Sequence, residues 1–156
     1  MTNKVISINK AKSLALGLKE LNKKVVLCHG TFDLLHTGHI KRMQSAKAQG
    51  DILFVSITAD KFVLKGPGRP VFNESLRAGN IAALESVDYV FINHSQTAIL
   101  SIESVQPSYY AKGSDYKNTS EDVTGNITKE IDAVKKYGGS IYFTDEITFS
   151  SSSLIN

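Results

Sequence analysis

The chain has 156 residues, of which 42% are hydrophobic, and a formal net charge of +3. This length and composition suffice for one domain around a single core. They exclude a membrane-spanning helix, because the sequence has no run of eighteen apolar residues, and the mild positive charge suits anionic substrates without calling for nucleic acid. Residues 1–9 lack the long apolar core of a signal peptide, and the single cysteine, Cys28, allows no disulfide within the chain, so we expect a cytoplasmic protein.

Apolar strand-like runs and helical repeats alternate along the chain. Leu14, Leu18 and Leu21 recur at helical spacing, which predicts an amphipathic helix over residues 9–22. Strands are predicted at residues 24–29, 52–58, 88–92, 108–111 and 140–144. Helices are predicted at residues 38–49, 73–86 (with Asn73 as N-cap), 96–104 and 127–137. Strands separated by helices favour right-handed crossovers, so we expect an α/β fold: a single Rossmann-like domain with a parallel five-stranded sheet flanked by helices.

The stretch over residues 25–39 organises this pattern. It begins as a buried strand, breaks at Gly30, crosses a short turn and enters the helix predicted from Gly38. The free N–H groups and the positive end of the dipole at a helix N-terminus favour an anion. His36 and His39 are three residues apart, which places both imidazoles on one side, where each can donate a hydrogen bond to a phosphate oxygen.

The same stretch resembles the signature of the cytidylyltransferase-type nucleotidyltransferases, through Gly30-Thr31-Phe32-Asp33 followed by His36-Thr37-Gly38-His39. The family joins a nucleoside triphosphate to a phosphorylated small molecule and releases pyrophosphate. The resemblance implies catalytic roles for His36 and His39, nucleotide or phosphate binding by Gly30, Thr31, Phe32 and Gly38, and acceptor or sugar contacts by Asp33 and Lys41. Asp33 could instead orient a histidine or a hydrated magnesium ion, Lys41 could be a solvated lysine, and the two histidines could be a buried pair in a generic turn.

The loop over residues 60–77 carries Lys61, Lys65, Arg69 and Arg77, with glycine and proline between them. Such cations could close over a triphosphate and neutralise the charge on the leaving pyrophosphate. The alternative is a solvated surface loop. Residues 64–71 and 82–88 resemble the nucleotidyltransferase domain of the bifunctional heptose enzymes, which make ADP-heptose from ATP and a heptose 1-phosphate. That resemblance implies phosphate contacts for Lys65, as a catalytic residue, and for Arg77.

Residues 110–116 resemble the family's lysine–glycine–x–aspartate turn after the fourth strand. A glycine at a strand end lets the backbone approach a nucleotide closely. Lys112, Gly113 and Asp115 could therefore meet the sugar or the acceptor, although a plain turn with an aspartate cap also explains them.

Residues 149–155 resemble the family's serine–threonine motif at the start of the final helix. Hydroxyls and free N–H groups there suit the β- and γ-phosphates, which implies phosphate binding by Ser150, Ser151 and Ser152. The alternative is a flexible serine tail. Shortly before this motif, the related glycerol-phosphate cytidylyltransferases carry an arginine that reads cytosine. Residues 144–148 of this chain lack it, which argues against CTP.

The position of the last residue bears on the expected domain boundaries. It ends at Asn156, barely one turn past the serines, and so short a helix is marginal. We expect an N-terminal helical extension over residues 1–23 and a nucleotidyltransferase domain over residues 24–156, which could be a fragment of a longer chain fused to, or partnered with, a sugar kinase.

These observations support three functional hypotheses. The first is transfer of a nucleoside monophosphate, AMP favoured, from a nucleoside triphosphate to a sugar phosphate such as heptose 1-phosphate. The second is a CTP-dependent enzyme acting on a polyol phosphate such as glycerol 3-phosphate, and the third is a nucleotide-binding module without catalysis. No cluster has the spacing of a tight protein metal site, so Mg²⁺ should arrive with the nucleotide. The resemblance further suggests a homodimer, while the charge and the apolar pattern predict no nucleic-acid or membrane partner.

Overall fold

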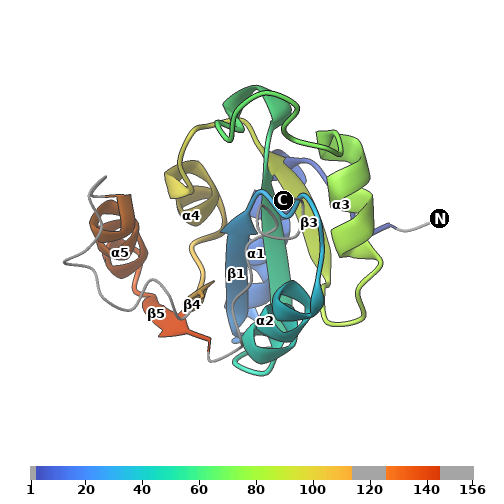
Figure 1. The fold of residues 1–156 in the computed structure, drawn as a ribbon. Coiled ribbons are helices and arrows are strands. Elements are labelled where there is room, and N and C mark those ends of the chain that lie inside the picture. Colours follow the sequence, from blue (N-terminus) through green and yellow to red (C-terminus); the bar gives the residue numbers. More distant parts are fainter. Residues whose placement is uncertain (1–2, 114–125, 145–156) are drawn as a thin grey trace.

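A computed structural model describes residues 3–113 and 126–144 (Figure 1). Five parallel strands form one sheet in the order β3-β2-β1-β4-β5. The strands are β1 (Val25–Gly30), β2 (Ile52–Thr58), β3 (Tyr89–Asn93), β4 (Tyr109–Lys112) and β5 (Ser140–Phe143). The helices are α1 (Ile8–Glu20), α2 (Thr37–Lys47), the short η1 (Asp60–Phe62), α3 (Glu74–Ala82), α4 (Ile99–Val105) and α5 (Asn126–Lys136). This confirms the predicted α/β fold with a parallel five-stranded sheet.

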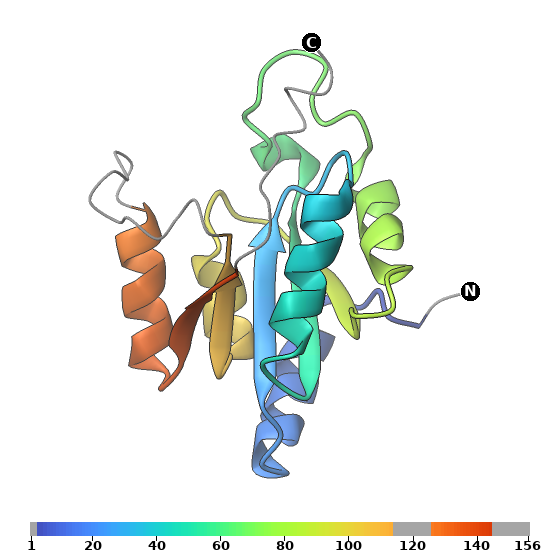
Figure 2. The same cartoon turned by 60° about the horizontal axis from the view of Figure 1, so that its bottom comes forward.

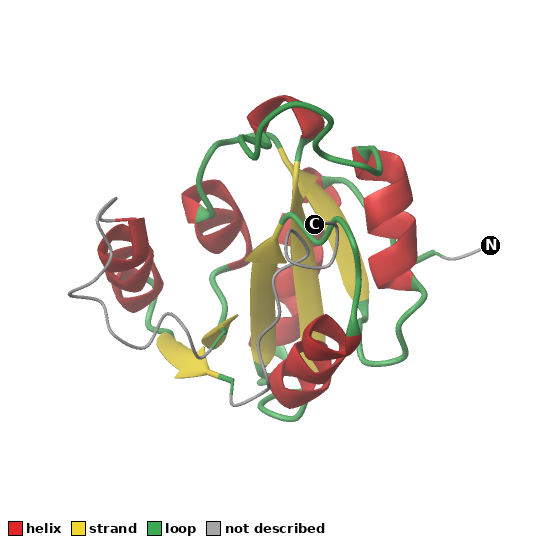
Figure 3. Ribbon diagram, in the orientation of Figure 1, coloured by secondary structure: helices red, strands yellow, loops and turns green. Residues whose placement is uncertain are grey.

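Helices cover both faces of the sheet, which Figure 3 shows as red helices on either side of the yellow strands. The odd-numbered side chains of β1, Val25 and Leu27, pack in one buried cluster with α1, α4 and α5. The intervening residues Val26 and Cys28 pack in a second cluster with α2 and α3. Side chains of a strand alternate between faces, so β1 contributes to both cores and is buried on both sides.

Helix caps explain where two of the helices begin. Ser7 caps α1 by accepting a hydrogen bond from the Lys10 N–H at 3.1 Å. Asn73 Oδ1 accepts from the Leu76 N–H at 2.9 Å, which confirms Asn73 as the N-cap of α3. The predicted end of that helix at residue 86 is wrong: α3 ends at Ala82, and the Leu84 N–H turns back to the Ile81 carbonyl in a tighter turn.

The strand order places a crevice at one end of the sheet. From β1 the chain moves outward through β2 to β3, and then returns to β4 on the other side of β1. Ligands in such sheets bind where the order reverses, beyond the carboxyl ends of the strands. Figure 2 shows that the end of β1, the first turn of α2 and the segment between β2 and α3 all lie at this end. Across residues 3–113 and 126–144, no helix is long and apolar enough to span a bilayer.

Candidate active site

The turn after β1 is built around a buried aromatic ring. Phe32 adopts a positive φ of 51°, an uncommon conformation for a bulky residue, and only 4% of its surface is exposed. A Cβ added to Gly30 would lie 2.9 Å from Phe32 Cζ, so glycine is needed where this ring packs. The ring meets the His39 imidazole edge-on, with centroids 5.7 Å apart. The buried Phe32 ring therefore helps to hold the His39 imidazole in place.

His36 and His39 form the N-terminus of α2. His36 is the N-cap, and its Nδ1 accepts a hydrogen bond from the Gly38 N–H at 3.1 Å. His39 Nδ1 accepts from the His36 N–H at 3.4 Å, and the two rings stack with centroids 3.9 Å apart. Because each Nδ1 accepts, the neutral rings carry their hydrogen on Nε2. Both histidines thus present an N–H donor at a helix N-terminus, as phosphate binding requires.

Asp33 fixes the loop between β2 and α3. Its carboxylate accepts hydrogen bonds from the backbone N–H groups of Val71 and Phe72, at 2.7 and 2.8 Å, and from Arg69 Nε at 3.1 Å. Burial alone would raise the pKa of this carboxyl. The two N–H groups and the Arg69 charge outweigh it, and they hold the pKa of Asp33 below its usual value. The structure thus shows Asp33 anchoring the loop, while a role toward the acceptor or magnesium stays a prediction.

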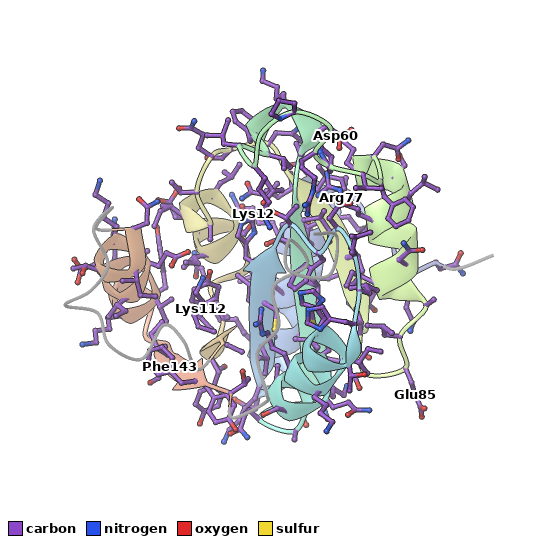
Figure 4. The ribbon with its side chains drawn as sticks, viewed as in Figure 1. Lys12, Asp60, Arg77, Glu85, Lys112 and Phe143 are labelled. Atoms are coloured by element: carbon purple, nitrogen blue, oxygen red, sulfur yellow. The ribbon has the colours of Figure 1, made fainter. Side chains whose placement is uncertain are left out.

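Arg77 is completely buried beneath the same loop. Its guanidinium donates to the carbonyls of Phe72 and Thr31, both at 2.9 Å, and to Asp60 Oδ1 at 2.7 Å. Figure 4 shows Asp60 and Arg77 next to each other at the end of the sheet. These contacts tie α3, η1 and the turn after β1 together, so Arg77 positions the wall of the site. The direct phosphate contact implied by the resemblance stays a prediction.

A cleft of about 320 Å³ opens between these elements. Seven of the predicted site residues line it: Gly30, Thr31, Phe32, His39, Lys65, Lys112 and Gly113. Burial, together with the nearby charges of Arg69 and Arg77, lowers the pKa of Lys65, although Asp33 acts in the opposite direction. The described lining contains three cationic side chains, Arg42, Lys65 and Lys112, and no carboxylate. Such a lining suits a polyphosphate.

Lys112, at the end of β4, is held by a contact with α5 that the sequence analysis did not predict. Its Nζ lies 3.6 Å from Glu130 Oε2 of α5 and 5.5 Å from the centre of the Tyr110 ring. Glu130, which is only 7% exposed, also accepts a hydrogen bond from the Tyr110 hydroxyl at 2.9 Å. A buried carboxylate therefore positions this lysine in the cleft wall at the end of β4.

Sequence reasoning missed three polar residues of the cleft, His29, Arg42 and Thr58, and the apolar Ala111. His29 could have been found, because it is the last strand residue before the Gly30 turn. Arg42 follows His39 by three residues, which is one helical turn. Thr58 ends the neighbouring strand β2, and only the pairing of β1 with β2 brings it to the cleft. A second hollow, of about 430 Å³ near the starts of α4 and α5, is lined by none of the predicted residues.

Some predicted site residues are not in the cleft or are not described. Lys41 is exposed on α2 and does not line the cleft. Asp115, Ser150, Ser151 and Ser152 lie outside the described residues. Among the residues that the structure does describe, no group of three or more histidine, cysteine or acidic side chains could hold a metal ion.

Comparison with known proteins identifies the family of the chain. The model of the cytidylyltransferase-like family matches residues 27–156, so the chain belongs to that family. It is a cytidylyltransferase-like nucleotidyltransferase domain. The bifunctional protein HldE of Geobacter metallireducens is 42% identical over 79% of the chain, and that of Aliarcobacter butzleri is 41% identical over 82%. The HldE of Methylobacillus flagellatus is 36% identical over 98% of the chain. The chain spans only about a quarter of these relatives, with 24–30% of each covered.

Solved structures show the same fold at lower identity. A lipopolysaccharide core biosynthesis protein from Thermoplasma volcanium matches with a TM-score of 0.64 and 24% identity, covering 82% of this chain and 99% of that protein. A pantoate–β-alanine ligase from Francisella tularensis also matches with a TM-score of 0.64, at 17% identity, covering 95% of this chain and 68% of the ligase. Both likenesses extend to the fold alone.

Proposed function

We propose that the chain transfers AMP from ATP to a sugar 1-phosphate, with heptose 1-phosphate as the favoured acceptor, and releases pyrophosphate. The observation that carries this proposal is the pair of Nε2–H donors at the start of α2, beside a cleft whose charged lining is entirely cationic among the described residues. The similarity to bifunctional HldE proteins supports the choice of acceptor.

In the proposed reaction an oxygen of the acceptor phosphate attacks the α-phosphorus in line. The new O–P bond forms as the bond to the bridging oxygen breaks, and pyrophosphate leaves with magnesium. Phosphoryl chemistry of this kind depends on positioning and charge stabilisation. His36 and His39 donate to the phosphate oxygens, and Lys65 neutralises the charge that develops on the leaving group.

Several further roles belong to the same proposal. Thr31 and Gly38 would add backbone contacts to the phosphates, and Ser150, Ser151 and Ser152 would hold the pyrophosphate. Lys112, Gly113 and Asp115 would contact the sugar or the acceptor, and Lys41 would contact the acceptor phosphate. Because the relatives are named bifunctional and this chain covers only 24–27% of their length, we also propose a second catalytic domain, a sugar kinase, on the same or a separate chain. The homodimer and the cytoplasmic location stay predictions, as does the division of the chain at residue 23.

The test is pyrophosphate release from each of the four ribonucleoside triphosphates with magnesium, against sugar 1-phosphates and polyol phosphates, with acceptor-free reactions as controls. We expect release with ATP and heptose 1-phosphate. Release only with CTP and glycerol 3-phosphate would replace the proposal with the cytidylyltransferase hypothesis. Nucleotide binding without release from any pair would indicate a non-catalytic module.

A further inference from the structure

His29 lies at the point where the sheet meets the cleft. It is the last side chain of β1 before Gly30, and it lines the cleft with Thr58 and Lys112. Leu27 packs in the cluster with α1, α4 and α5, whereas Cys28 packs with α2 and α3. By the alternation of a strand, His29 faces the α1–α4–α5 side. It is therefore on the opposite face of the sheet from α2, whose N-terminus carries the paired histidines.

Two hydroxyls of β2 contact the His29 ring. Nδ1 lies 2.7 Å from Ser56 Oγ, and Nε2 lies 3.4 Å from Thr58 Oγ1. Thr58 also donates to the Gly30 carbonyl at 3.4 Å. The short contact to the buried Ser56 holds the ring in place. The two contacts of 3.4 Å are at the outer limit for hydrogen bonds, so a ligand can replace them at Nε2 and at the Thr58 hydroxyl at little cost.

The cleft therefore has two kinds of polar lining. Arg42, Lys65 and Lys112 supply positive charge, which suits phosphate. His29 supplies an uncharged donor and acceptor, because burial and the Lys112 charge lower its pKa to about 3. A neutral imidazole beside a threonine hydroxyl matches a substrate hydroxyl better than it matches a phosphate.

We propose that His29 and Thr58 form a hydroxyl-binding floor of the acceptor subsite, and that His29 helps determine which phosphorylated acceptor the cleft takes. This inference rests on the proposed function, since it concerns the acceptor of that reaction. A site built to hydrogen-bond a hydroxyl discriminates against analogues that lack it, because its own polar groups are then left unpaired. The floor thus favours a polyhydroxylated acceptor over a simple alkyl phosphate.

The experiment compares binding of heptose 1-phosphate and of ethyl phosphate, which has no hydroxyl, to the full chain by calorimetry. The variants are His29→Ala, His29→Gln and Thr58→Val, and His94→Ala serves as a histidine control from an exposed position outside the cleft. We expect the wild type and His94→Ala to bind heptose 1-phosphate at least about tenfold more tightly than ethyl phosphate. His29→Ala and Thr58→Val should lose most of this preference, with unchanged affinity for ethyl phosphate and ATP, and His29→Gln should keep part of it.

Other outcomes overturn the inference. A preference that survives undiminished in Thr58→Val and His29→Ala would assign both residues to the structure of the sheet alone, and equal losses for both ligands would indicate general damage. Circular dichroism checks the fold, and Thr58→Val, which keeps the side-chain shape, decides the question if His29→Ala does not fold. A wild type with no preference overturns the inference whether or not it releases pyrophosphate. A wild type with the preference but no pyrophosphate release refutes only the proposed function.

Discussion

Two walls of the cleft are built in opposite ways. At the start of α2, His36 and His39 are oriented by contacts between residues two or three positions apart. At the end of β1, His29 is oriented by Ser56 and Thr58, which are 27 and 29 positions away. Asp33 reaches 36 to 39 positions along the chain to anchor the loop before α3. One wall is formed by a local segment, and the other exists only once the sheet has assembled.

Substitutions in the two walls should therefore affect different properties, catalytic activity for the local wall and the free energy of unfolding for the long-range wall. Local contacts at a helix N-terminus orient donors that can bind phosphate, and each is worth about 1 kcal/mol to the fold. Long-range contacts with buried charges have a larger effect on stability, since breaking one leaves its partner buried and unpaired. We therefore expect substitutions at α2 to reduce activity more than stability, and substitutions in the long-range wall to reduce stability first.

The largest expected effect is a loss of stability when Asp33, which makes the long-range contacts to the loop before α3, is replaced. Asp33→Asn replaces an oxygen that accepts hydrogen bonds with an NH₂ group that faces other donors, and it leaves Arg69 without its counter-ion. We expect the free energy of unfolding to fall by about 3 kcal/mol, measured by urea denaturation. Asp88→Asn is the matched control, because Asp88 forms a partly exposed pair with Lys47 and should cost less than about 1 kcal/mol. Equal losses in the two variants would contradict the anchoring role.

The second effect is on the local wall. His39→Ala should lower turnover by at least about a hundredfold, or about 2.7 kcal/mol in the barrier, because it removes a donor to the transition-state charge. The fold should remain intact by circular dichroism. Gln44→Ala, at an exposed position on the same helix, is the control and should keep wild-type turnover. Near-wild-type activity in His39→Ala would rule out the role assigned to this histidine.

The smallest effect concerns pH. Because the pKa of His29 is lowered from 6.5 to about 3 in the folded chain, the unfolded chain binds more protons between these values. Stability is therefore lost as the pH falls through this window. We expect His29 to contribute a loss of about 2 kcal/mol between about pH 7.5 and about pH 5. His29→Gln should lack this contribution, and an identical pH dependence of urea denaturation in both proteins would show that His29 is not held neutral.

Sequence reasoning reached most of the fold because its signals are local. The apolar runs predicted all five strands, and the Asn73 cap was found from residue type and position. Periodicity extends past the point where tertiary contacts end a helix, so the end of α3 was misplaced. The isolated parallel bridge between Val5 and Val90 was not predicted, because a single residue that joins a sheet edge has no pattern of its own.

Arg77 illustrates what residue type alone does not specify. A cation on a loop rich in glycine and proline indicates a phosphate contact, and the resemblance implies the same. The structure places its guanidinium completely inside, with each of its three nitrogens bonded to a protein oxygen, and the phosphate contact stays a prediction. Whether an arginine lies inside or faces the cleft depends on the oxygens that surround it, and here two carbonyls and one carboxylate come from three separate segments.

The sequence by itself determined the strand–turn–helix unit, the two histidines on one side of a helix N-terminus and the glycine before them, because each depends on spacing within a few residues. Only the tertiary structure decided that His29, Thr58 and Lys112 share one cleft and that Glu130 places Lys112. The physical reason is that strand pairing joins residues that are remote along the chain. Burial then sets the charge of His29, which no local pattern records.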